Sequence, residues 1–481
     1  MIQFKSTVPG KAGAYAICVE KGLKAFAAAA VLGKALDSDT AKALKKVADF
    51  TVDAGDVANL TLAGKDGRID LFFYGAGKSF DADSIKDMAK KLYAALAAAK
   101  VQDAVIVLPE KLDAGGFYVQ LSMAAYSFDK YKTKPAAKKI KKITLAGGKG
   151  KVDADACKAM ADAVANSRAY VDEPANALTP QKFAQSLAKL KDLGVKVNVM
   201  DRQQLEKEGL NLIIAVGRGS ANPPCLVIMQ YQGALANAGY AALAGKGVCF
   251  DSGGINIKDA PEEMFQDMTG AAIVAGAIEY LARVKARVNV VATVALVENM
   301  PGCDALKPGD IIKSYKGKTV EIANTDAEGR LILADAMAYV QDKFAPKAMV
   351  DVATLTGLAV MMFKERRAAL FPSSDKLAAQ LEKAGEKTGE LLWSLPMDDY
   401  YGDLMKSSRA DISNYTSTGG GGRGSPISAA KFLEAFVDTR KTQWAHIDLA
   451  NTTFIDRMST GWGVRLLTTW ILDNFANGKP R

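Results

Sequence analysis

AALAGKGVCFDSGGINIK, residues 241–258, begins with ten residues that are nearly all small or apolar and then turns through two glycines. An apolar run of this length, closed by a turn, is typical of a strand that is buried on both faces of a sheet. A helical pattern over 268–284 and a second apolar run over 288–297 come next along the chain. This order of strand, helix and strand predicts a parallel pair that is covered by the helix.

Similar units lie on both sides of this segment and extend the predicted sheet. Their strands are separated by helical patterns, so we expect a mostly parallel central sheet that is covered by helices. The further strands are expected at 195–200, 212–216, 226–231, 319–323, 348–353 and 445–449, and the further helices at 331–344 and 427–437.

The chain of 481 residues is too long for a single hydrophobic core, and the fold class that we predict is α/β with two domains. Residues 1–150 combine strand-like runs with helical periods rich in alanine and lysine, which predicts a smaller N-terminal α/β domain. A helical pattern over 154–170 predicts a connecting helix within 151–173, and 174–481 form the larger domain. In the N-terminal domain, strands are expected at 69–74 and 104–108 and a helix at 84–99.

The composition, with 49% apolar and 24% charged residues, is that of a soluble globular protein. The net charge is +9, but the lysines are spread along helical patterns, which indicates solvated helix faces. A denser lysine run at 130–142 has no aromatic residue after Tyr131 and no recognition motif, so no nucleic-acid partner is expected. No apolar stretch of about eighteen residues occurs, which predicts no membrane span.

The five cysteines are odd in number, widely separated and free of CxxC spacing, which indicates a reducing compartment rather than a disulfide framework. The N-terminal segment has no uninterrupted apolar stretch and no A-x-A site, so it suits a first strand better than a cleaved signal. Together these features predict a cytoplasmic protein. The cysteines are Cys18, Cys157, Cys225, Cys249 and Cys303.

The single histidine limits the kinds of active site that the chain can build. Zinc sites of the HExxH type, Ser-His-Asp triads and Cys-His dyads each need a histidine beside other specific groups. His446 lies in WAHIDLA, a run typical of a buried strand, where a hydrogen-bonded structural histidine is the commoner interpretation. A hydrolytic metal site in this chain must therefore be built mainly from carboxylates.

The segment NTDAEGRLILADA, residues 324–336, places Asp326, Glu328 and Arg330 at alternate positions after an expected strand and before a helix. Alternate residues of an extended segment point the same way, so we expect the three in one crevice at the carboxyl ends of the strands. Two close carboxylates repel unless a cation or a proton lies between them. The alternative is that Asp326 and Glu328 only cap the helix.

Two further acids and two lysines lie at similar junctions. Lys246 interrupts the first apolar run, Asp251 ends it, Lys258 follows the glycine turn, and Asp267 precedes the next helix. Taken singly, Lys246 would be interpreted as an edge-strand lysine whose ammonium group reaches water, and Asp267 as a helix cap. Together, four acids and two lysines at neighbouring strand ends favour a shared site.

These segments resemble the signatures of the leucyl (cytosol) aminopeptidase family. The resemblance rests on GKGVCFDSGGINIK, MFQDMTGAA, ENMPG, KPGD and above all NTDAEGRLILADA, and it includes TLTG at 354–357 and WAHIDLA at 444–450. It covers the chain from Pro174 to the C-terminus. The resemblance implies that 174–481 form a catalytic domain, which removes N-terminal residues from peptides with the help of two divalent cations.

The resemblance also implies the ligands of both metals. Lys246 and Asp267 would bind the tighter metal, and Asp326 would hold the more exchangeable one. Asp251 and Glu328 would bridge the two. A water shared by two cations can reach a pKa of about 7, so no histidine is needed. A lysine can ligate only as the neutral amine, which requires that the pKa of Lys246 be strongly depressed.

The remaining roles follow from the same resemblance. Lys258 would stabilise the oxyanion of the tetrahedral intermediate, and Arg330 would hold a bicarbonate ion that serves as the general base. The free α-amino group of the peptide would bind the second metal and Asp267, so a blocked N-terminus should not be cleaved. The positions expected to line the side-chain pocket are Met264, Thr354, Gly357 and Ala450.

The metals implied are zinc or manganese, with magnesium or cobalt as alternatives. The family also implies a homohexamer and a preference for apolar N-terminal residues such as leucine, although Asn451, Thr452 and the bulky run at 360–370 depart from its pattern. Two other hypotheses remain, a non-catalytic scaffold or DNA-binding regulator and a two-metal phosphoesterase. The complete set of ligand positions and the NTDAEGRL segment favour the aminopeptidase.

Overall fold

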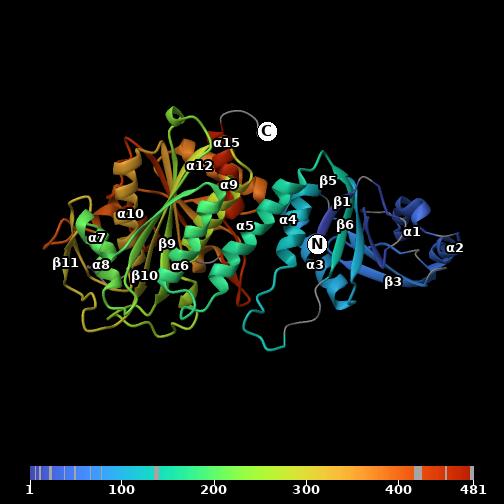
Figure 1. Ribbon diagram of the computed structural model, residues 1–481, viewed down its shortest axis with the longest axis horizontal. Helices are drawn as coiled ribbons and strands as arrows, with labels where there is room; N and C mark the ends of the chain where they lie inside the picture. The colour runs from blue at the N-terminus through green and yellow to red at the C-terminus, as the bar shows by residue number, and fades with distance from the viewer. Residues whose placement is uncertain are drawn as a thin grey trace. The chain divides into compact units, whose positions relative to one another are not determined.

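The computed structural model describes residues 1–481 apart from 6, 10–11, 21–23, 37, 48–49, 65–66, 77–78, 135–139, 417–424, 450–451 and 477–481. The chain divides into two compact units, Met1–Asp162 and Ala163–Arg481, and each contains its own large sheet (Figure 1). The predicted α/β fold with two domains is therefore confirmed. The helix predicted over 154–170 is present as α5 (Ala154–Asp172), and the boundary between the units falls inside it.

The first unit contains six described strands, in the order β1-β6-β5-β2-β4-β3 across the sheet, and only the pair of β3 and β4 is antiparallel. The elements are β1 (Ile2–Lys5), β2 (Ala14–Val19), α1 (Ala25–Ala29), α2 (Ser38–Val47), β3 (Val57–Gly64), β4 (Gly67–Gly75), α3 (Ala82–Ala98), β5 (Asp103–Asp113), α4 (Ala114–Ala124) and β6 (Lys142–Lys149).

Alternate residues of β2 enter different apolar clusters, which shows that both faces of this sheet are covered. Ala14 and Ala16 pack with α3 and α4, whereas Tyr15 and Ile17 pack with α1 and α2. The strands predicted at 69–74 and 104–108 and the helix predicted at 84–99 are present as β4, β5 and α3.

The second unit is built on an eight-stranded sheet in the order β15-β14-β17-β13-β9-β10-β8-β7. Its strands are β7 (Lys196–Met200), β8 (Cys225–Gln232), β9 (Ala241–Asp251), β10 (Asn289–Asn299), β13 (Ala348–Ala353), β14 (Ala368–Pro372), β15 (Leu392–Ser394) and β17 (Gln443–Asp448). The α-helices after α5 are α6 (Pro180–Ala188), α7 (Arg202–Glu208), α8 (Asn211–Gly217), α9 (Thr269–Arg283), α10 (Gly329–Phe344), α11 (Gly357–Phe363), α12 (Asp375–Thr388), α13 (Asp399–Asp403), α14 (Ser425–Glu434) and α15 (Val464–Phe475).

β9 lies in the middle of this sheet with β10 and β13 as parallel neighbours. Figure 1 shows α9 and α10 on opposite sides of it. A Cβ added at Gly245 would lie 2.6 Å from the carbonyl oxygen of Gly270 at the start of α9. Lys246, the next residue, faces the other side and passes close to Gly329 at the start of α10. The central strand therefore directs alternate residues at the first turns of two helices.

One predicted strand is wrong and another lies outside the main sheet. Residues 212–216 form α8 rather than a strand. A buried carboxylate of α10, that of Asp335, accepts the backbone N–H of Leu212 at 2.8 Å, which satisfies a free donor at the first turn of α8. The strand predicted at 319–323 is β12 (Thr319–Glu321), which pairs with β11 (Ile311–Lys313) and β16 (Ile412–Ser413) in a separate sheet.

The other predicted elements are present with small shifts at their ends. Among the helices that the structure describes, none combines the length and the apolar character that crossing a bilayer requires.

Candidate active site

Lys246 is buried in the central strand, so it is not an edge-strand lysine that reaches water. Its Nζ atom lies 2.7 Å from Oδ2 of Asp267 and 2.9 Å from Oε1 of Glu328, and it donates to the carbonyl oxygen of Thr354 at 2.9 Å. A Cβ on Gly329 would lie 2.4 Å from Lys246 Cε, so the first residue of α10 must be a glycine for the lysine to pass.

The glycine turn after β9 brings Lys258 back to the end of the strand. Gly253 and Gly254 have φ angles of 87° and 66°, which side chains rarely tolerate. The backbone N–H of Gly253 donates to Oδ1 of Asp251 at 2.9 Å, and Lys258 Nζ lies 2.9 Å from the other carboxylate oxygen. Each Asp251 oxygen is thus held by a donor from the turn.

The acidic loop, residues 323–328, completes the cluster. Oδ1 of Asp326 lies 2.5 Å from Lys258 Nζ, and carboxylate oxygens of Asp251, Asp326 and Glu328 lie within 4.8 Å of one another. Glu328 is the residue before α10, yet its side chain makes no capping hydrogen bond. Helix capping therefore does not explain Glu328.

The carboxylate of Asp267 likewise does not cap α9. The residue at the start of that helix is Met268, and no side chain caps it. The Asp267 carboxylate accepts a hydrogen bond from the hydroxyl of Thr354 at 2.7 Å and pairs with Lys246.

The expected alternation of Glu328 and Arg330 along an extended segment is not found. Glu328 already has helical backbone angles and Arg330 lies in the first turn of α10, so residues 328 and 330 do not alternate like those of an extended strand. The guanidinium of Arg330 is buried and donates from Nη1 to the carbonyl oxygen of Asn414 at 2.9 Å. Its Nε has no hydrogen-bond partner among the residues that the structure describes.

These residues line a pocket of about 270 Å³. The predicted residues in its wall are Lys246, Asp251, Lys258, Met264, Asp267, Asp326, Glu328, Thr354 and Gly357. Leu355 and Val360 add apolar surface to the same wall. Arg330 is not part of the wall, and Ala450 lies outside the described residues.

Four carboxylates face two ammonium groups in this pocket, which leaves an excess of negative charge. Burial raises the pKa of Asp267 well above its usual range, although Lys246 opposes the shift. Burial, together with the charges of Glu328 and Asp251, raises the pKa of Asp326 to about 6. Raised carboxyl pKa values of this kind are expected at a site where a bound cation would offset the repulsion between the carboxylates.

The donor set fits divalent cations. Oε2 of Glu328 is buried and has no hydrogen-bond partner among the described residues, and such an oxygen is free to bind a metal. Burial lowers the pKa of Lys246, but Asp267, Glu328 and Asp251 outweigh it, and the pKa is raised. The depression that metal ligation requires is therefore not supplied by burial, so an arriving cation has to displace the lysine proton.

Comparison with known proteins identifies the family. Residues 165–468 match the family model described as the cytosol aminopeptidase family, catalytic domain, and residues 16–135 match that of the N-terminal domain. The chain belongs to the cytosol aminopeptidase family. It is therefore a peptidase, as the sequence predicted, and the carboxylate cluster agrees with a metal-dependent aminopeptidase.

Similar proteins cover between 75% and 97% of the aminopeptidase. A probable cytosol aminopeptidase of Brucella anthropi is 37% identical over 458 residues, which is 90% of this chain and 91% of the relative. One of Sinorhizobium fredii is 42% identical over 380 residues, or 75% of each chain. Among solved structures, the bottromycin maturation enzyme BotP in complex with Mn is 28% identical with a TM-score of 0.81, covering 97% of this chain and 100% of BotP.

Three asparagines that the sequence reasoning missed hold the acidic loop of the aminopeptidase. Nδ2 of Asn299 donates to Oδ1 of Asp251 at 2.8 Å and to the carbonyl oxygen of Thr325 at 3.0 Å. Oδ1 of Asn256 accepts the backbone N–H of Thr325 at 2.9 Å. Asn414, the residue after β16, binds the loop from another side. Asn299 lies in the ENMPG segment, whereas no local pattern marks Asn414.

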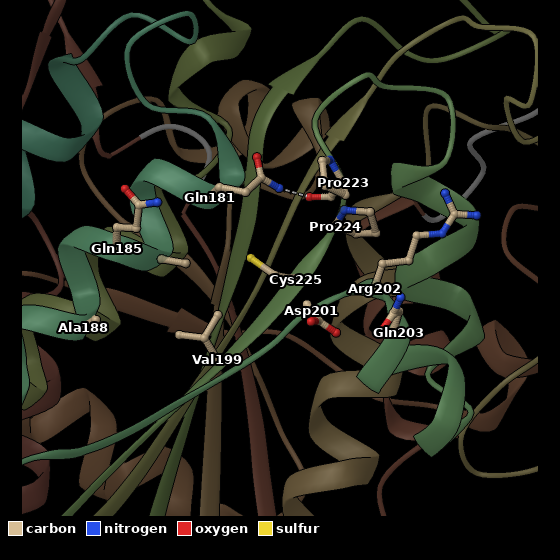
Figure 2. A pocket seen from close by; sticks show the side chains of 11 residues that line it. Gln181, Gln185, Ala188, Val199, Asp201, Arg202, Gln203, Pro223, Pro224 and Cys225 are labelled. Carbon is tan, nitrogen blue, oxygen red and sulfur yellow. Dashed lines mark hydrogen bonds between the residues drawn. The ribbon is translucent and has the colours of Figure 1, made fainter.

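A second pocket in this unit contains none of the predicted site residues. Its volume is about 550 Å³, and Figure 2 shows Cys225 in its floor beside Val199. Gln181 donates a hydrogen bond to the carbonyl oxygen of Pro223 at its rim. Burial raises the pKa of the Cys225 thiol to about 12, which makes it a poor nucleophile. This pocket therefore offers no activated cysteine nucleophile among its described residues.

His446 has the structural role that its sequence context favours. It is fully buried in β17, and Nδ1 lies 2.6 Å from Oδ1 of Asp351 on the neighbouring strand β13. Nε1 of Trp444 donates to the other Asp351 oxygen at 2.9 Å. Burial lowers the pKa of His446, but the charge and hydrogen bond of Asp351 outweigh it, and the pKa lies above its usual value.

The ordinary pKa of a histidine side chain is about 6.5, and we expect the single imidazole of this chain to titrate above that value. Because the pKa in the folded state is raised, the imidazolium contributes stability that is complete below about pH 6.5 and is lost as the pH rises through the folded pKa. NMR titration of histidine-labelled protein measures this midpoint directly. Asp351→Asn should move it below about 6.5, since burial then dominates, and a wild-type midpoint below that value would contradict the prediction.

Proposed function

We propose that this aminopeptidase removes apolar N-terminal residues, such as leucine, from peptides with a free N-terminus, using two divalent cations. The observation that carries the proposal is the cluster of Asp251, Asp326 and Glu328, in which the buried Oε2 of Glu328 is left without a hydrogen bond among the described residues. An apolar wall beside this cluster could receive the side chain of the first residue.

Lys246 and Asp267 would hold one cation, Asp326 the other, and Asp251 and Glu328 both. When bound, two such cations polarise a carbonyl group and lower the pKa of a shared water. We favour zinc or manganese as the metal, with magnesium or cobalt as alternatives. Carboxylates and an amine suit all four metals to differing extents. Manganese has the added support of the complex formed by BotP.

Lys258 is placed to act on the scissile carbonyl. Burial lowers its pKa, but Asp251 and Glu328 outweigh burial and raise it, so the side chain carries a proton at neutral pH. It is partly exposed to the pocket, and as an ammonium group it can donate to the oxyanion of a tetrahedral intermediate.

Asp267 would bind the α-amino group of the peptide, which explains a requirement for a free N-terminus. Arg330 would hold bicarbonate as the general base. The support for this role is that its Nε is buried without a hydrogen-bond partner among the described residues. Burial lowers the pKa of Arg330 to about 10, so it remains a cation at neutral pH and can attract an anion.

The side-chain pocket would be formed by Met264, Thr354 and Gly357, with Leu355 and Val360 beside them. Because Met264, Leu355 and Val360 place apolar side chains in the pocket wall, we favour leucine-like residues over charged ones.

We further propose a cytoplasmic homohexamer. The relatives carry the name cytosol aminopeptidase, and α11 exposes four large apolar side chains that further copies of the chain could cover. These are Leu358, Val360, Met361 and Met362. Sedimentation of the purified protein as a monomer would contradict the assembly.

Hydrolysis of a panel of aminoacyl-p-nitroanilides tests the function. The protein is stripped of metal, reloaded with Mn²⁺ or Zn²⁺, and assayed beside N-acetylated versions of the same substrates. We expect release of p-nitroaniline that requires metal, favours leucine and is confined to free N-termini. No turnover of any substrate by folded, metal-loaded protein would reject the proposal and favour a scaffold role.

A further inference from the structure

One buried asparagine holds the acidic loop through every polar atom of its side chain. Oδ1 of Asn414 accepts the backbone N–H groups of Ala323 at 2.8 Å and Asn324 at 3.3 Å. Nδ2 donates to the carbonyl oxygens of Asn324 at 2.7 Å and Ala327 at 3.2 Å. A primary amide has two hydrogens to donate and two lone pairs to accept with, so these four bonds use its whole capacity.

The backbone of Asn414 is itself fixed on both sides. Its N–H donates to the carbonyl oxygen of Glu321 at 3.0 Å, which continues the pairing of β16 with β12. Its carbonyl oxygen accepts the bond from Nη1 of Arg330. One residue therefore ties both the acidic loop and Arg330 to a small sheet.

The side chain of Asn414 is fully buried and does not line the pocket. It cannot touch a peptide directly, and any effect that it has on hydrolysis must pass through the residues that it holds. Asn256 and Asn299 hold other points of the same loop from the β9 and β10 side. The loop is therefore clamped between two parts of the second unit rather than resting on one.

We propose that Asn414 is a positioning residue for peptide hydrolysis, whose side-chain amide fixes the carboxylates of Asp326 and Glu328 relative to Arg330. This role rests on the proposed function, because it supposes that those groups bind the cations and the base. Small errors in the placement of such groups are costly, since outer partners of metal ligands typically change affinity or activity by about 10- to 100-fold when they are mutated.

Only an amide satisfies this position. Asn414→Asp keeps the size and shape of the side chain but turns both donating hydrogens into lone pairs that face the carbonyl oxygens of Asn324 and Ala327. It also adds a negative charge beside the acidic loop. Asn414→Ala removes all four bonds and leaves the loop amides without partners.

Asn289 offers a matched control. It is also buried, and its amide also bridges a loop, accepting the N–H of Ala234 at 3.0 Å and donating to the carbonyl oxygen of Leu235 at 2.8 Å. It begins β10, at the opposite end from Asn299 and the metal-site pocket. Asn289→Asp and Asn289→Ala should therefore cost stability of the same kind without touching the acidic loop.

The experiment compares the Asn414 and Asn289 variants of the full chain by thermal unfolding, by kcat and KM on leucine p-nitroanilide, and by calorimetric titration with Mn²⁺ alone. We expect both pairs to lose stability. Only the Asn414 variants should lose about 10- to 100-fold in kcat with little change in KM, and bind Mn²⁺ about tenfold more weakly.

Folded Asn414 variants with the kcat and the Mn²⁺ affinity of their Asn289 counterparts would overturn the proposal. If Asn414→Ala does not fold, Asn414→Asp supplies the comparison, because it preserves the side-chain volume. A wild-type protein that hydrolyses no substrate would reject the proposed function, and the calorimetric difference would still decide whether Asn414 positions the carboxylates.

Discussion

Replacing Glu328 by glutamine should reduce kcat/KM by about 10³-fold or more, because each of the two cations supplies several kcal/mol of transition-state stabilisation and this residue is placed to serve both. Glutamine keeps the shape of the side chain, so the fold is preserved. It offers a neutral carbonyl oxygen where Oε2 of Glu328 lies buried without a hydrogen bond among the described residues. The assay is hydrolysis of leucine p-nitroanilide at saturating Mn²⁺.

The same change should not destabilise the metal-free protein. Oxygens of Glu328, Asp251 and Asp326 lie within 4.8 Å of one another, so removing one charge relieves their repulsion, and this gain offsets the loss of the ion pair between Glu328 and Lys246. In the presence of a chelator, we expect Glu328→Gln to unfold close to the temperature of the wild type. Added metal should stabilise the wild type much more than the variant.

Glu279→Gln is the matched control for this prediction. Glu279 is also buried, but its carboxylate accepts from Asn166 and pairs with Arg283 on α9, away from the pocket wall. This variant should lose stability and keep its activity. Comparable activity of Glu328→Gln and the wild type would exclude the proposed ligand role of Glu328.

Lys258→Met should lower kcat by about 10²- to 10³-fold with a small effect on KM, the loss expected when a donor to the oxyanion is removed. The methionine side chain is unbranched and of similar length, so it fills the space without a charge. Lys258 is ion-paired with Asp251 and Asp326, so its removal leaves the oxygens of these carboxylates available to bind cations. Metal binding should therefore survive, and the variant should be inactive while fully loaded.

Lys431→Met controls for the loss of a partly buried, paired lysine. Lys431 lies on α14 and pairs with Glu434 of the same helix and with Asp399 of α13. It does not line the pocket. Its variant should hydrolyse peptides like the wild type. A Lys258→Met protein whose KM rises while kcat stays unchanged would show that Lys258 binds the ground state and not the oxyanion.

The sequence predicted best the elements whose burial is uniform. β9, β10 and β13 are long apolar runs with parallel neighbours, and tertiary contacts reinforce what their patterns indicate. The run at 212–216 is equally apolar but short, and a short apolar run does not distinguish a strand from a helix. There the outcome depends on Asp335, which lies far away in the sequence and binds the first turn of α8.

In the candidate site too, residues marked by a local pattern could be predicted, whereas those that depend on remote partners could not. Its charged residues could be found because a buried charge needs a reason, and because lysine and acidic residues rarely interrupt apolar strands. Asn414 could not be found, since asparagine is common in turns and its partners at Ala323, Asn324 and Ala327 are remote in sequence. The predicted alternation of Glu328 and Arg330 failed because α10 begins at Gly329, two residues before the predicted start at 331.

The clamp at Asn414 also bears on when the enzyme becomes active during its synthesis. The ribosome makes Lys246, Asp267 and Glu328 well before Asn414 and before β17, which completes the sheet next to β13. Chains fold as they emerge, N-terminal parts first. A nascent chain therefore carries every proposed metal ligand for some time without the parts that arrange them, and competence to cut peptides is expected to arise only when translation is nearly finished.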